Sequence, residues 1–522
     1  MNAIARAALL GCAALLACGP ARAQSLSMAV GAPVTSIDPH FHNVGPNNTV
    51  ASILFDSLLR MDERSRIGPG LAESWKPVED GWEFKLRPGV RFHNGAELTA
   101  DDVAFTLARL PDVPNSPGLF TAYTRQIQAV EIIGPLTLRL RTAGPAPLLP
   151  ADVSQVAILN RATHAGATTE DFNSGRAAIG TGPYRLVSWR SGERLELERN
   201  EQHWGPRPHW QRVDYRLILN DASRVAALLA GDVEFIDQVP TGDIARLRRD
   251  QRLKLTEAAS LRLVYLAFDH LRDTATPFAT DNDGKPLARN PLKDRRVRQA
   301  LSLAIDRKAI VERVMEGVAI PTGQFMPPGA FGYNPDIPVP AVDLESARRL
   351  LAEAGFPQGF RVTLHGPNDR YLNDSRIIQA VAQMWSRAGV RTAVEAAPYA
   401  PFISRASRQE FSAFLVSWGS STGEPLTGLR ATMGSYDRSR SLGAVNRSRY
   451  SNPAYDEVLQ QASVTIEDAA RDRLLQQATQ LVMEDAAILP LHFQVNVWAM
   501  RRGLRHAGRV DERTRPQDIS LE

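Results

Sequence analysis

Apolar and polar residues alternate with a period of two in several short runs of this chain. Between Gly81 and Phe92, for example, Trp82, Phe84 and Leu86 are separated by charged residues, which predicts a strand with one buried face. The same pattern predicts strands over residues 26–30, 130–140 (two strands joined at Gly134-Pro135), 184–198, 233–236, 360–364, 390–395, 411–417 and 491–500.

Other runs place an apolar residue at every third or fourth position, the spacing of a helix with one buried face. The most regular covers residues 294–315, where Val297 and Leu301 fall on one side and predict a single long helix. Thr99 is a good N-cap for a helix over 100–110. Further helices are predicted over 49–60, 221–231, 343–354, 374–388 and 468–484, and loops over 38–48, 274–290 and 419–427. Because strands and helices alternate, the pattern favours a mixed α/β sheet.

Length and charge exclude several classes of protein. A chain of 522 residues is long enough for about three domains and for a core that needs no disulfide or metal ion to be stable. Its 61 Lys and Arg residues against 57 Asp and Glu residues leave a formal net charge of +4, spread along the chain. A nucleic-acid-binding protein of this length would carry a larger basic patch, so nucleic acid is not an expected partner.

The first 23 residues have the features of a secretory signal peptide: a basic start, an apolar run over 7–17 and an A-x-A cleavage site at 21–23. A second interpretation stays open, because residues 15–18 resemble a bacterial lipobox, which would leave Cys18 as a lipidated first residue. Both interpretations predict export. No later apolar run approaches the roughly 20 residues of a membrane-spanning helix, so the exported protein is expected to be soluble or lipid-tethered.

The two cysteines, Cys12 and Cys18, both lie in this leader, so a chain cut after Ala23 has none. That cut would exclude structural disulfides, thiolate catalysis and cysteine-ligated zinc.

Several short motifs follow one another over nearly the whole mature chain. They include Leu86-Arg87-Pro88-Gly89-Val90, Thr99-Ala100-Asp101-Asp102-Val103, Gly180-Thr181-Gly182-Pro183-Tyr184, Ala304-Ile305-Asp306-Arg307, Asn452-Pro453-Ala454-Tyr455-Asp456 and Leu489-Pro490-Leu491. In type and order they resemble the motifs of the extracytoplasmic solute-binding proteins of ABC transporters, in the peptide/nickel-binding class (solute-binding protein family 5).

The resemblance implies an α/β fold, a two-lobed periplasmic-binding-protein clamp of the class II type, with an extra α+β domain inserted in the first lobe. The expected divisions are 1–23 for the signal peptide, 24–59, 178–264 and 487–522 for the first lobe, 60–177 for the inserted domain and 265–486 for the second lobe.

The resemblance also implies a function. Such a protein captures a peptide or peptide-like solute in the periplasm, closes over it and delivers it to permease subunits of an ABC importer in the inner membrane. It is not an enzyme, needs no cofactor or metal ion, and is expected to be a monomer. The solute itself is left open, since relatives carry peptides, opines, glutathione-like thiols, sugars and chelated nickel. A chemoreceptor or chaperone-like accessory would use the same clamp.

One loop bears on the choice of solute. In the dipeptide-binding relatives, a loop that begins with Trp carries an aspartate that pairs with the α-ammonium group of the peptide. Here Trp418 matches that loop, and Ser421 falls where the aspartate is expected. A buried ammonium group needs a paired anion, so a free dipeptide is a weaker expectation. Glu424 is an alternative anion, although its position before Pro425 favours a role in shaping the turn.

Three positions outside this loop complete the predicted ligand site. Arg370 offers a guanidinium fork for a solute carboxylate, and a surface ion pair with Asp374 is the alternative interpretation. His42 and Asn43 lie in a loop expected beside the cleft, while His40 and His42 lack the nearby third ligand of a metal site. The predicted ligand-binding set is Trp418 (stacking), Ser420, Ser421, Arg370, His42 and Asn43, with no catalytic and no metal-binding residue.

A different class of function also fits the same loop. Residues 419–423 match the G-x-S-x-G pattern of serine hydrolases, with Asp456, His492 and His506 downstream in the hydrolase order. Against this, Pro425 falls where the helix of a nucleophile elbow should be running, and no HGGG-type oxyanion segment is present. A secreted serine hydrolase that uses Ser421 is therefore the alternative function.

Overall fold

The computed structural model describes residues 24–420, 422–440 and 442–522. The predicted signal peptide, both cysteines and Ser421 lie outside the described residues. One mixed sheet of twelve described strands runs through the centre of the molecule. Its order is β13 (Ala279–Thr280), β15 (Arg361–Pro367), β17 (Ala413–Gly419), β12 (Leu253–Phe268), β18 (Ile488–Arg501), β11 (Phe235–Ile236), β1 (Ser25–Val30), β10 (Arg212–Leu217), β9 (Arg194–Arg199) and β8 (Tyr184–Arg190), with β14 (Ala319–Pro321) on β18 and β16 (Arg391–Ala397) on β15.

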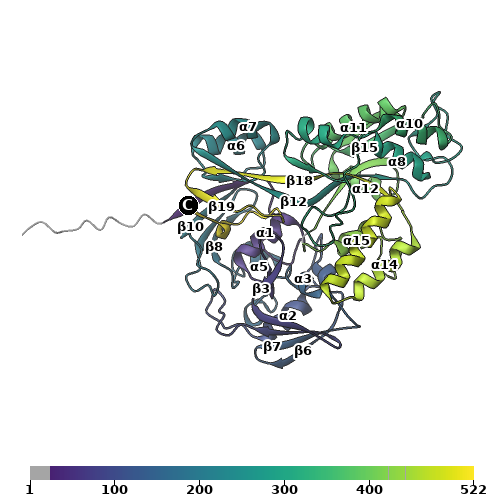
Figure 1. The fold of residues 1–522 in the computed structure, drawn as a ribbon. Helices are drawn as coiled ribbons and strands as arrows, with labels where there is room; N and C mark the ends of the chain where they lie inside the picture. Colours follow the sequence, from purple (N-terminus) through teal and green to yellow (C-terminus); the bar gives the residue numbers. More distant parts are fainter. Residues whose placement is uncertain (1–23, 421, 441) are drawn as a thin grey trace, which may run out of the picture.

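The sheet extends through two lobes (Figure 1). Each lobe has a hydrophobic core of its own. In the first lobe, β1 and β8 to β11 carry α1 (Gly45–Leu54), α6 (Asp221–Ala230) and α7 (Thr241–Arg249), and residues such as Met28 and Phe235 are buried. In the second lobe, β15 to β17 carry α8 (Arg295–Leu303), α10 (Leu344–Glu353) and α11 (Asp374–Ala388). A second core there lies under α12 (Tyr399–Ser407), α13 (Pro425–Thr432), α14 (Pro453–Val464) and α15 (Asp468–Glu484).

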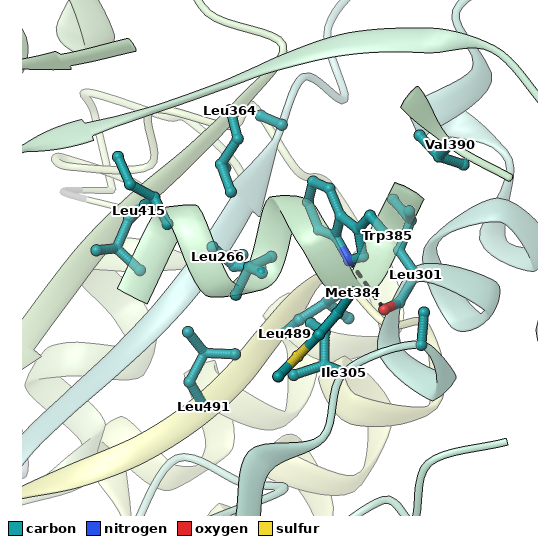
Figure 2. Close-up of a cluster of buried hydrophobic side chains, with 14 of the residues drawn as sticks. Leu266, Leu301, Ile305, Leu364, Met384, Trp385, Val390, Leu415, Leu489 and Leu491 are labelled. Carbon is teal, nitrogen blue, oxygen red and sulfur yellow. Dashed lines mark hydrogen bonds between the residues drawn. The ribbon is translucent and has the colours of Figure 1, made fainter. Parts of the chain in front are cut away.

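The core of the second lobe is centred on one tryptophan. Trp385 of α11 is fully buried, and its indole N–H donates to the carbonyl of Leu301 in α8 at 3.0 Å (Figure 2). Leu266 of β12, Leu415 of β17 and Leu489 of β18 pack in the same cluster. The hydrogen bond satisfies the one polar atom of a large apolar side chain, so the helices are fixed to each other and to the sheet.

Two long strands connect the lobes. β12 and β18 pair antiparallel, from Leu253 with Arg501 in the first lobe to Ala267 with Ile488 in the second. Their register shifts after Ala259, so that residues 260–262 form a bulge where the strand passes between the lobes. Bulges bend a strand and interrupt its pairing; here pairing with β18 is interrupted, while Arg262 still pairs with Gly419 of β17 and the backbone N–H of Leu261 donates to the carbonyl of Val510 at 3.2 Å.

A four-stranded antiparallel sheet lies apart from the main sheet, at the bottom of Figure 1. Its order is β4 (Ala72–Val78), β5 (Gly81–Leu86), β7 (Thr137–Thr142) and β6 (Ile127–Gly134). Helix α2 (Ala100–Arg109) and this sheet share a core that buries Phe84 and Val103. The backbone N–H of Thr99 donates to the carboxylate of Asp102 at 2.9 Å, which confirms the predicted start of α2.

The remaining described elements are small. They are the pairs β2 (Leu59–Met61) with β3 (Ile67–Pro69) and β19 (Leu504–His506) with β20 (Ile519–Leu521), the helices α3 (Leu149–Val153), α4 (Arg161–His164), α5 (Thr169–Asn173) and α9 (Arg307–Ala309), a π-helical turn (Ile310–Val314), and the 3₁₀ turns Phe120–Tyr123, Pro291–Lys293 and Pro516–Asp518. In the described part of the chain, no helix has the length and apolar character needed to cross a membrane. The mixed α/β sheet is confirmed, while the residue numbers of the domain boundaries stay a prediction.

The helix predicted over 49–60 is wrong at both ends, since α1 begins four residues earlier and ends at Leu54. The carbonyl of Leu54 accepts the backbone N–H of Gly182 at 3.0 Å. Two residues later, Asp56 turns inward and accepts the indole N–H of Trp204 at 2.9 Å. These long-range contacts outweigh the helical periodicity of the segment.

The single helix predicted over 294–315 is also wrong, because α8 ends at Leu303. Asp306 caps the next short helix with its carboxylate, which accepts a backbone N–H three residues on at 2.9 Å. The guanidinium of Arg307 donates to the carbonyl of Pro490 at 2.7 Å. A side-chain cap inside a helical pattern offers the backbone an alternative to continuous helix, and here the bend also lets Arg307 be buried.

Candidate functional site

A cavity of about 370 Å³ lies between the two lobes. The first lobe lines it with residues that directly follow β1 and β11, and the second lobe lines it with Arg370, Gly419 and Ser420. The bulge 260–262 and the C-terminal segment 510–514 complete its wall. Since β1 runs parallel to β10 and β11, the cavity lies at the carboxyl ends of these strands, where open α/β sheets bind their ligands. Its volume is within the range of small-molecule sites, roughly 300–1,000 Å³.

A half-buried ion pair forms part of the cavity wall. The guanidinium of Arg262 donates twice to the carboxylate of Glu512, at 2.8 and 2.9 Å, and the Ser260 hydroxyl donates to the same carboxylate at 2.7 Å. Burial favours the neutral carboxyl group, but the Arg262 guanidinium outweighs burial and holds the pKa of Glu512 below its ordinary value. Because both charges are satisfied within the protein, the pair defines the wall and leaves no charge for a solute.

A second carboxylate in the cavity is held differently. Asp237 directly follows β11, and its carboxylate accepts the backbone N–H of Gly31 at 2.8 Å and the hydroxyl of Thr514 at 3.2 Å. Burial raises the pKa of Asp237 to about 6, against the opposing effect of the Arg224 guanidinium. No ion pair to this carboxylate is present among the described residues.

Arg370 lines the cavity from the second lobe. The sequence predicts Arg370 as a residue that binds a solute carboxylate. The expected alternative, an ion pair with Asp374, is not formed: the Asp374 carboxylate accepts the backbone N–H groups of Arg370 and Tyr371, each at 3.0 Å. The guanidinium carbon lies 5.7 Å and 5.5 Å from the ring centroids of Tyr371 and Tyr399. Within the described ranges, this guanidinium has no carboxylate partner, so it is available to a solute anion.

The loop after β17 is only partly as expected. Ser420 lines the cavity, and its hydroxyl donates to the carbonyl of Glu424 at 3.3 Å. Trp418 does not line this cavity; Gly428 and Phe325 pack against its indole ring. Its stacking on a solute stays a prediction, as does the role of Ser421, which is outside the described residues.

Glu424 is a structural residue of this loop. Its carboxylate caps α13 by accepting the backbone N–H of Leu426 at 3.3 Å, and it lies 3.3 Å from the guanidinium of Arg471. Burial raises the pKa of Glu424, and Arg471 opposes that shift. Helix α13 therefore begins at Pro425, within the stretch 419–427 that was predicted to be a loop.

Of the two residues predicted beside the cleft in the loop that contains His42 and Asn43, one lines the cavity. Asn43 lines the cavity, and its side-chain oxygen accepts the amide of Asn48 at 2.9 Å. His42 lies outside the cavity lining, with its ring nitrogen Nδ1 3.2 Å from the Thr35 hydroxyl. Its contact with a solute stays a prediction. Among the residues that the structure describes, no group of three or more His, Cys, Asp or Glu side chains is placed to hold a metal ion.

A smaller cavity, of about 220 Å³, adjoins the first. Asn48 and Arg513 line both cavities. The Arg513 guanidinium donates to the side-chain oxygen of Gln155 at 2.7 Å, and its burial lowers the pKa of Arg513. These two side chains therefore form the boundary between the main cavity and a space beside the inserted domain.

The residues of the hydrolase alternative are dispersed. His506 packs against Phe235 and Trp498 in the first lobe, with ring centroids 5.2 and 4.9 Å apart. His492 is buried on β18, and the Asp456 carboxylate accepts the backbone N–H of a serine on a neighbouring loop at 3.0 Å. Burial lowers the pKa of both histidines to about 4. In the described part of the chain, no hydrogen bond links these groups into a catalytic chain.

Sequence reasoning missed the charged groups that the fold brings to the cavity from other segments. Asp237 had a usable signal, because it directly follows the predicted strand 233–236, and Arg262 lies in an apolar run that reads as strand material. Glu512 had no signal in the sequence that could have identified it, because it lies in an irregular C-terminal segment that reaches the cavity only through the tertiary fold.

Comparison with known proteins gives the class to which this arrangement belongs. Residues 66–440 match the family model described as bacterial extracellular solute-binding proteins, family 5, middle region. The chain belongs to this family, and it is a substrate-binding protein of the ABC transporter type, a non-enzymatic binding protein. This overturns the serine-hydrolase alternative for Ser421.

Two similar proteins illustrate the range within the family. Heme-binding protein A of Haemophilus influenzae is 28% identical over 464 residues, which cover 82% of this chain and 79% of that protein. Glutathione-binding protein GsiB of Escherichia coli (strain K12) is 27% identical over 501 residues, which cover 94% and 93%. Both alignments extend far beyond the region matched by the family model.

Solved structures show the same fold. HbpA2 from Haemophilus parasuis has a TM-score of 0.81 at 24% identity, covering 95% of this chain and all 100% of that one. DppA from Helicobacter pylori, an ABC-transporter-associated periplasmic binding protein in complex with the peptide STSA, has a TM-score of 0.77 at 22% identity, covering 95% and 98%. The predicted two-lobed clamp with an extra domain is thereby confirmed.

Proposed function

We propose that this protein is the periplasmic component of an ABC importer that captures a peptide or peptide-like solute between its lobes and delivers it to permease subunits in the inner membrane. The N-terminal leader supports export, by cleavage after Ala23 or by lipidation at Cys18. The name of the relative GsiB states that it binds glutathione, which is a peptide-like thiol. A monomer is the form in which we expect the protein to work.

The observation that carries this proposal is the position of Arg370. It lines a cavity of about 370 Å³ between the lobes, and its guanidinium has no carboxylate partner among the described residues. A guanidinium beside a cavity binds a carboxylate through two parallel hydrogen bonds. Peptides with a free C-terminus, and glutathione, carry such a group.

Contacts between the parts of the clamp support enclosure of the solute. The side-chain amide of Asn373, in the second lobe, donates to the hydroxyl of Thr241 in the first lobe at 3.1 Å. On another side, Gly423 packs so closely on Ser65 that a β-carbon would lie 2.6 Å from the Ser65 carbonyl oxygen. A solute that touches both lobes stabilises this arrangement over an open one, because it binds the closed state better.

A thermal-shift screen of the mature chain, unfolded and refolded to remove bound solute, tests the proposal. The panel holds di- and tripeptides, glutathione, opines, sugars and nickel chelates. At about 100 times its dissociation constant, a true solute stabilises the fold by about 2.7 kcal/mol. We expect peptides or glutathione to raise the melting temperature, and Arg370→Gln to weaken that binding about tenfold to a hundredfold, since a charged hydrogen bond is lost.

The matched control is Arg376→Gln, because Arg376 is exposed on α11 and does not line the cavity. It should bind like the unaltered protein. If Arg370→Gln leaves the affinity unchanged, the carboxylate site is not at Arg370; if sugars alone bind, the solute class proposed here is wrong.

A further inference from the structure

One acidic residue of the cavity lining has no ion-pair partner among the described residues. Its three acidic lining residues are Asp237, Asp511 and Glu512. Glu512 is paired with Arg262, and Asp511 accepts two hydrogen bonds from Arg509, at 2.7 and 2.9 Å. Asp237 is the acidic group of the lining that has no ion-pair partner among the described residues.

Asp237 is only 7% exposed, and its negative charge is offset only in part, by Arg224. The nearest cation is Arg224, which is fully buried, but its guanidinium donates to the backbone carbonyl of Asp237 at 3.2 Å and to the carboxylate of Asp221 at 2.7 Å. The two donors to the Asp237 carboxylate, from Gly31 and Thr514, are neutral. Since each carboxylate oxygen can accept two hydrogen bonds, acceptor capacity remains.

The backbone around Asp237 is held in an unfavourable conformation. Gln238 has a φ of +46°, in the left-handed region, and its carbonyl accepts a hydrogen bond from Arg224 at 2.8 Å. Gly31 makes room for Arg224, because a β-carbon there would lie 2.8 Å from the guanidinium. Strained backbone that the surroundings enforce is found preferentially at ligand sites, and here it fixes the carboxylate at the edge of the cavity.

A buried carboxylate without a counter-charge is costly, so proteins either pair such a group or protonate it. A cation that enters the cavity would supply the missing charge. We propose that Asp237 binds a primary ammonium group of the solute, so that this cavity takes a zwitterionic solute such as a peptide with a free N-terminus. This inference rests on the proposed function and names the substrate class of the same site.

The anchor lies in the lobe opposite to the predicted one. By resemblance to the dipeptide-binding relatives, the amine-binding position is expected at residue 421, in the second lobe. That residue is a serine, which has no negative charge to offer. Asp237 comes from the first lobe, so a solute held by both Asp237 and Arg370 would span the two lobes. Because such a solute binds both halves, it would favour the closed clamp.

Protonation of Asp237 should make the binding of an ammonium group depend on pH. Burial raises the pKa of Asp237 to about 6, so a bound ammonium group must displace a proton from it below that pH. Its charged and titratable neighbours are Arg224 on α6 and Tyr215 on β10, and burial keeps Tyr215 neutral by raising its pKa. Elsewhere in the cavity lining, Glu512 is paired with Arg262 and Asp511 with Arg509, and the pKa values of both carboxyl groups are lowered. Asp237 is therefore the group here that titrates between pH 5 and 7.

Isothermal titration calorimetry of the ligand-stripped mature chain tests the assignment. The probes are Ala-Ala, Ala-Ala-Ala and glutathione, each with its free amine and in its N-acetyl form. We expect acetylation to weaken binding to the unaltered protein by about tenfold or more. Asp237→Asn should weaken binding of the free-amine probes to the same extent and should no longer distinguish the two forms. Affinity for the free amine should fall from pH 7 to pH 5 in the unaltered protein only.

The control is Asp232→Asn, at an exposed position five residues away, which should behave like the unaltered protein. If the acetylated probes bind as tightly as the free ones, the anchor is refuted while the proposed binding function stands. If no probe binds in either form, the proposed function fails, and the anchor with it. The acetylation comparison uses the unaltered chain, so it tests the anchor even if Asp237→Asn does not fold.

Discussion

At the scale of single residues, the cavity is defined by which charges the protein satisfies itself. Arg262 and Glu512 satisfy each other in a two-point contact, so neither is available to a solute. Asp237 and Arg370 are left without ionic partners among the described residues, in opposite lobes. Asp237 is buried, so its unpaired charge lowers the stability of the ligand-free protein, and a cationic group of a solute recovers that loss when it binds. Arg370 is exposed, so its lack of an ion pair carries no such cost.

A stability measurement without any solute follows from this. The pKa of Asp237 is raised to about 6 in the folded protein, above the ordinary value of 3.8. Between these values the folded chain holds a proton that the unfolded chain has lost, so stability falls as pH rises and stays lower above pH 6. Asp237→Asn should therefore match the unaltered ligand-free protein below pH 4 and exceed its free energy of unfolding by up to about 3 kcal/mol at pH 8.

Denaturant unfolding at pH 4 and pH 8 measures this difference. A variant that is equally destabilised at both pH values would show that Asp237 contributes through its hydrogen bonds to Gly31 and Thr514 and not through an unpaired charge.

At the scale of elements, the sequence predicted the strands and helices well wherever local pattern and tertiary contacts agree. The capped helix α2 and the alternating strands β5 and β7 are where the pattern placed them. The prediction from the sequence failed at α1, where the carbonyl of Leu54 accepts a hydrogen bond from the backbone N–H of the distant Gly182. It also failed after α8, where Asp306 caps a new helix. The candidate site was partly predicted, because Arg370, Ser420 and Asn43 do line the cavity. That Asp237 and Glu512 line the same cavity could be recognised only from the three-dimensional fold.

The motif Gly180-Thr181-Gly182-Pro183 packs closely against the C-terminal end of helix α1. A β-carbon on Gly182 would lie 2.4 Å from the carbonyl carbon of Leu54, which is backbone and cannot move aside. Gly182→Ala should therefore lower the free energy of unfolding by at least about 2 kcal/mol, because α1 must shift away from the first-lobe sheet. Gly134→Ala is the control, since nothing lies within 4 Å of a β-carbon there.

Thermal or urea unfolding of the two variants provides the comparison. Gly134→Ala should change stability by no more than about 0.5 kcal/mol. Equal stability of both variants would mean that the packing of Gly182 on α1 does not matter for the fold.

At the scale of the whole molecule, the inserted domain and the second lobe are packed together as well as the two lobes. Leu148, beside α3, packs against the second-lobe core under α13 to α15, and Ile466 packs in the other direction against the core of the inserted domain. Burial raises the pKa of Asp152 to about 8 at this contact, with nearby Glu424 adding to the shift. The extra domain is therefore packed against the second lobe as well as joined to the first.

The central claim is that this chain binds a solute between its lobes and releases it unchanged. Native mass spectrometry of the refolded mature chain with the peptides and glutathione tests this most directly, followed by analysis of the small molecule after unfolding. The account predicts one solute per chain, recovered intact, with the bound fraction unchanged in Arg376→Gln and clearly reduced in Arg370→Gln. Recovery of a cleaved solute, or equal retention by both variants, would contradict it.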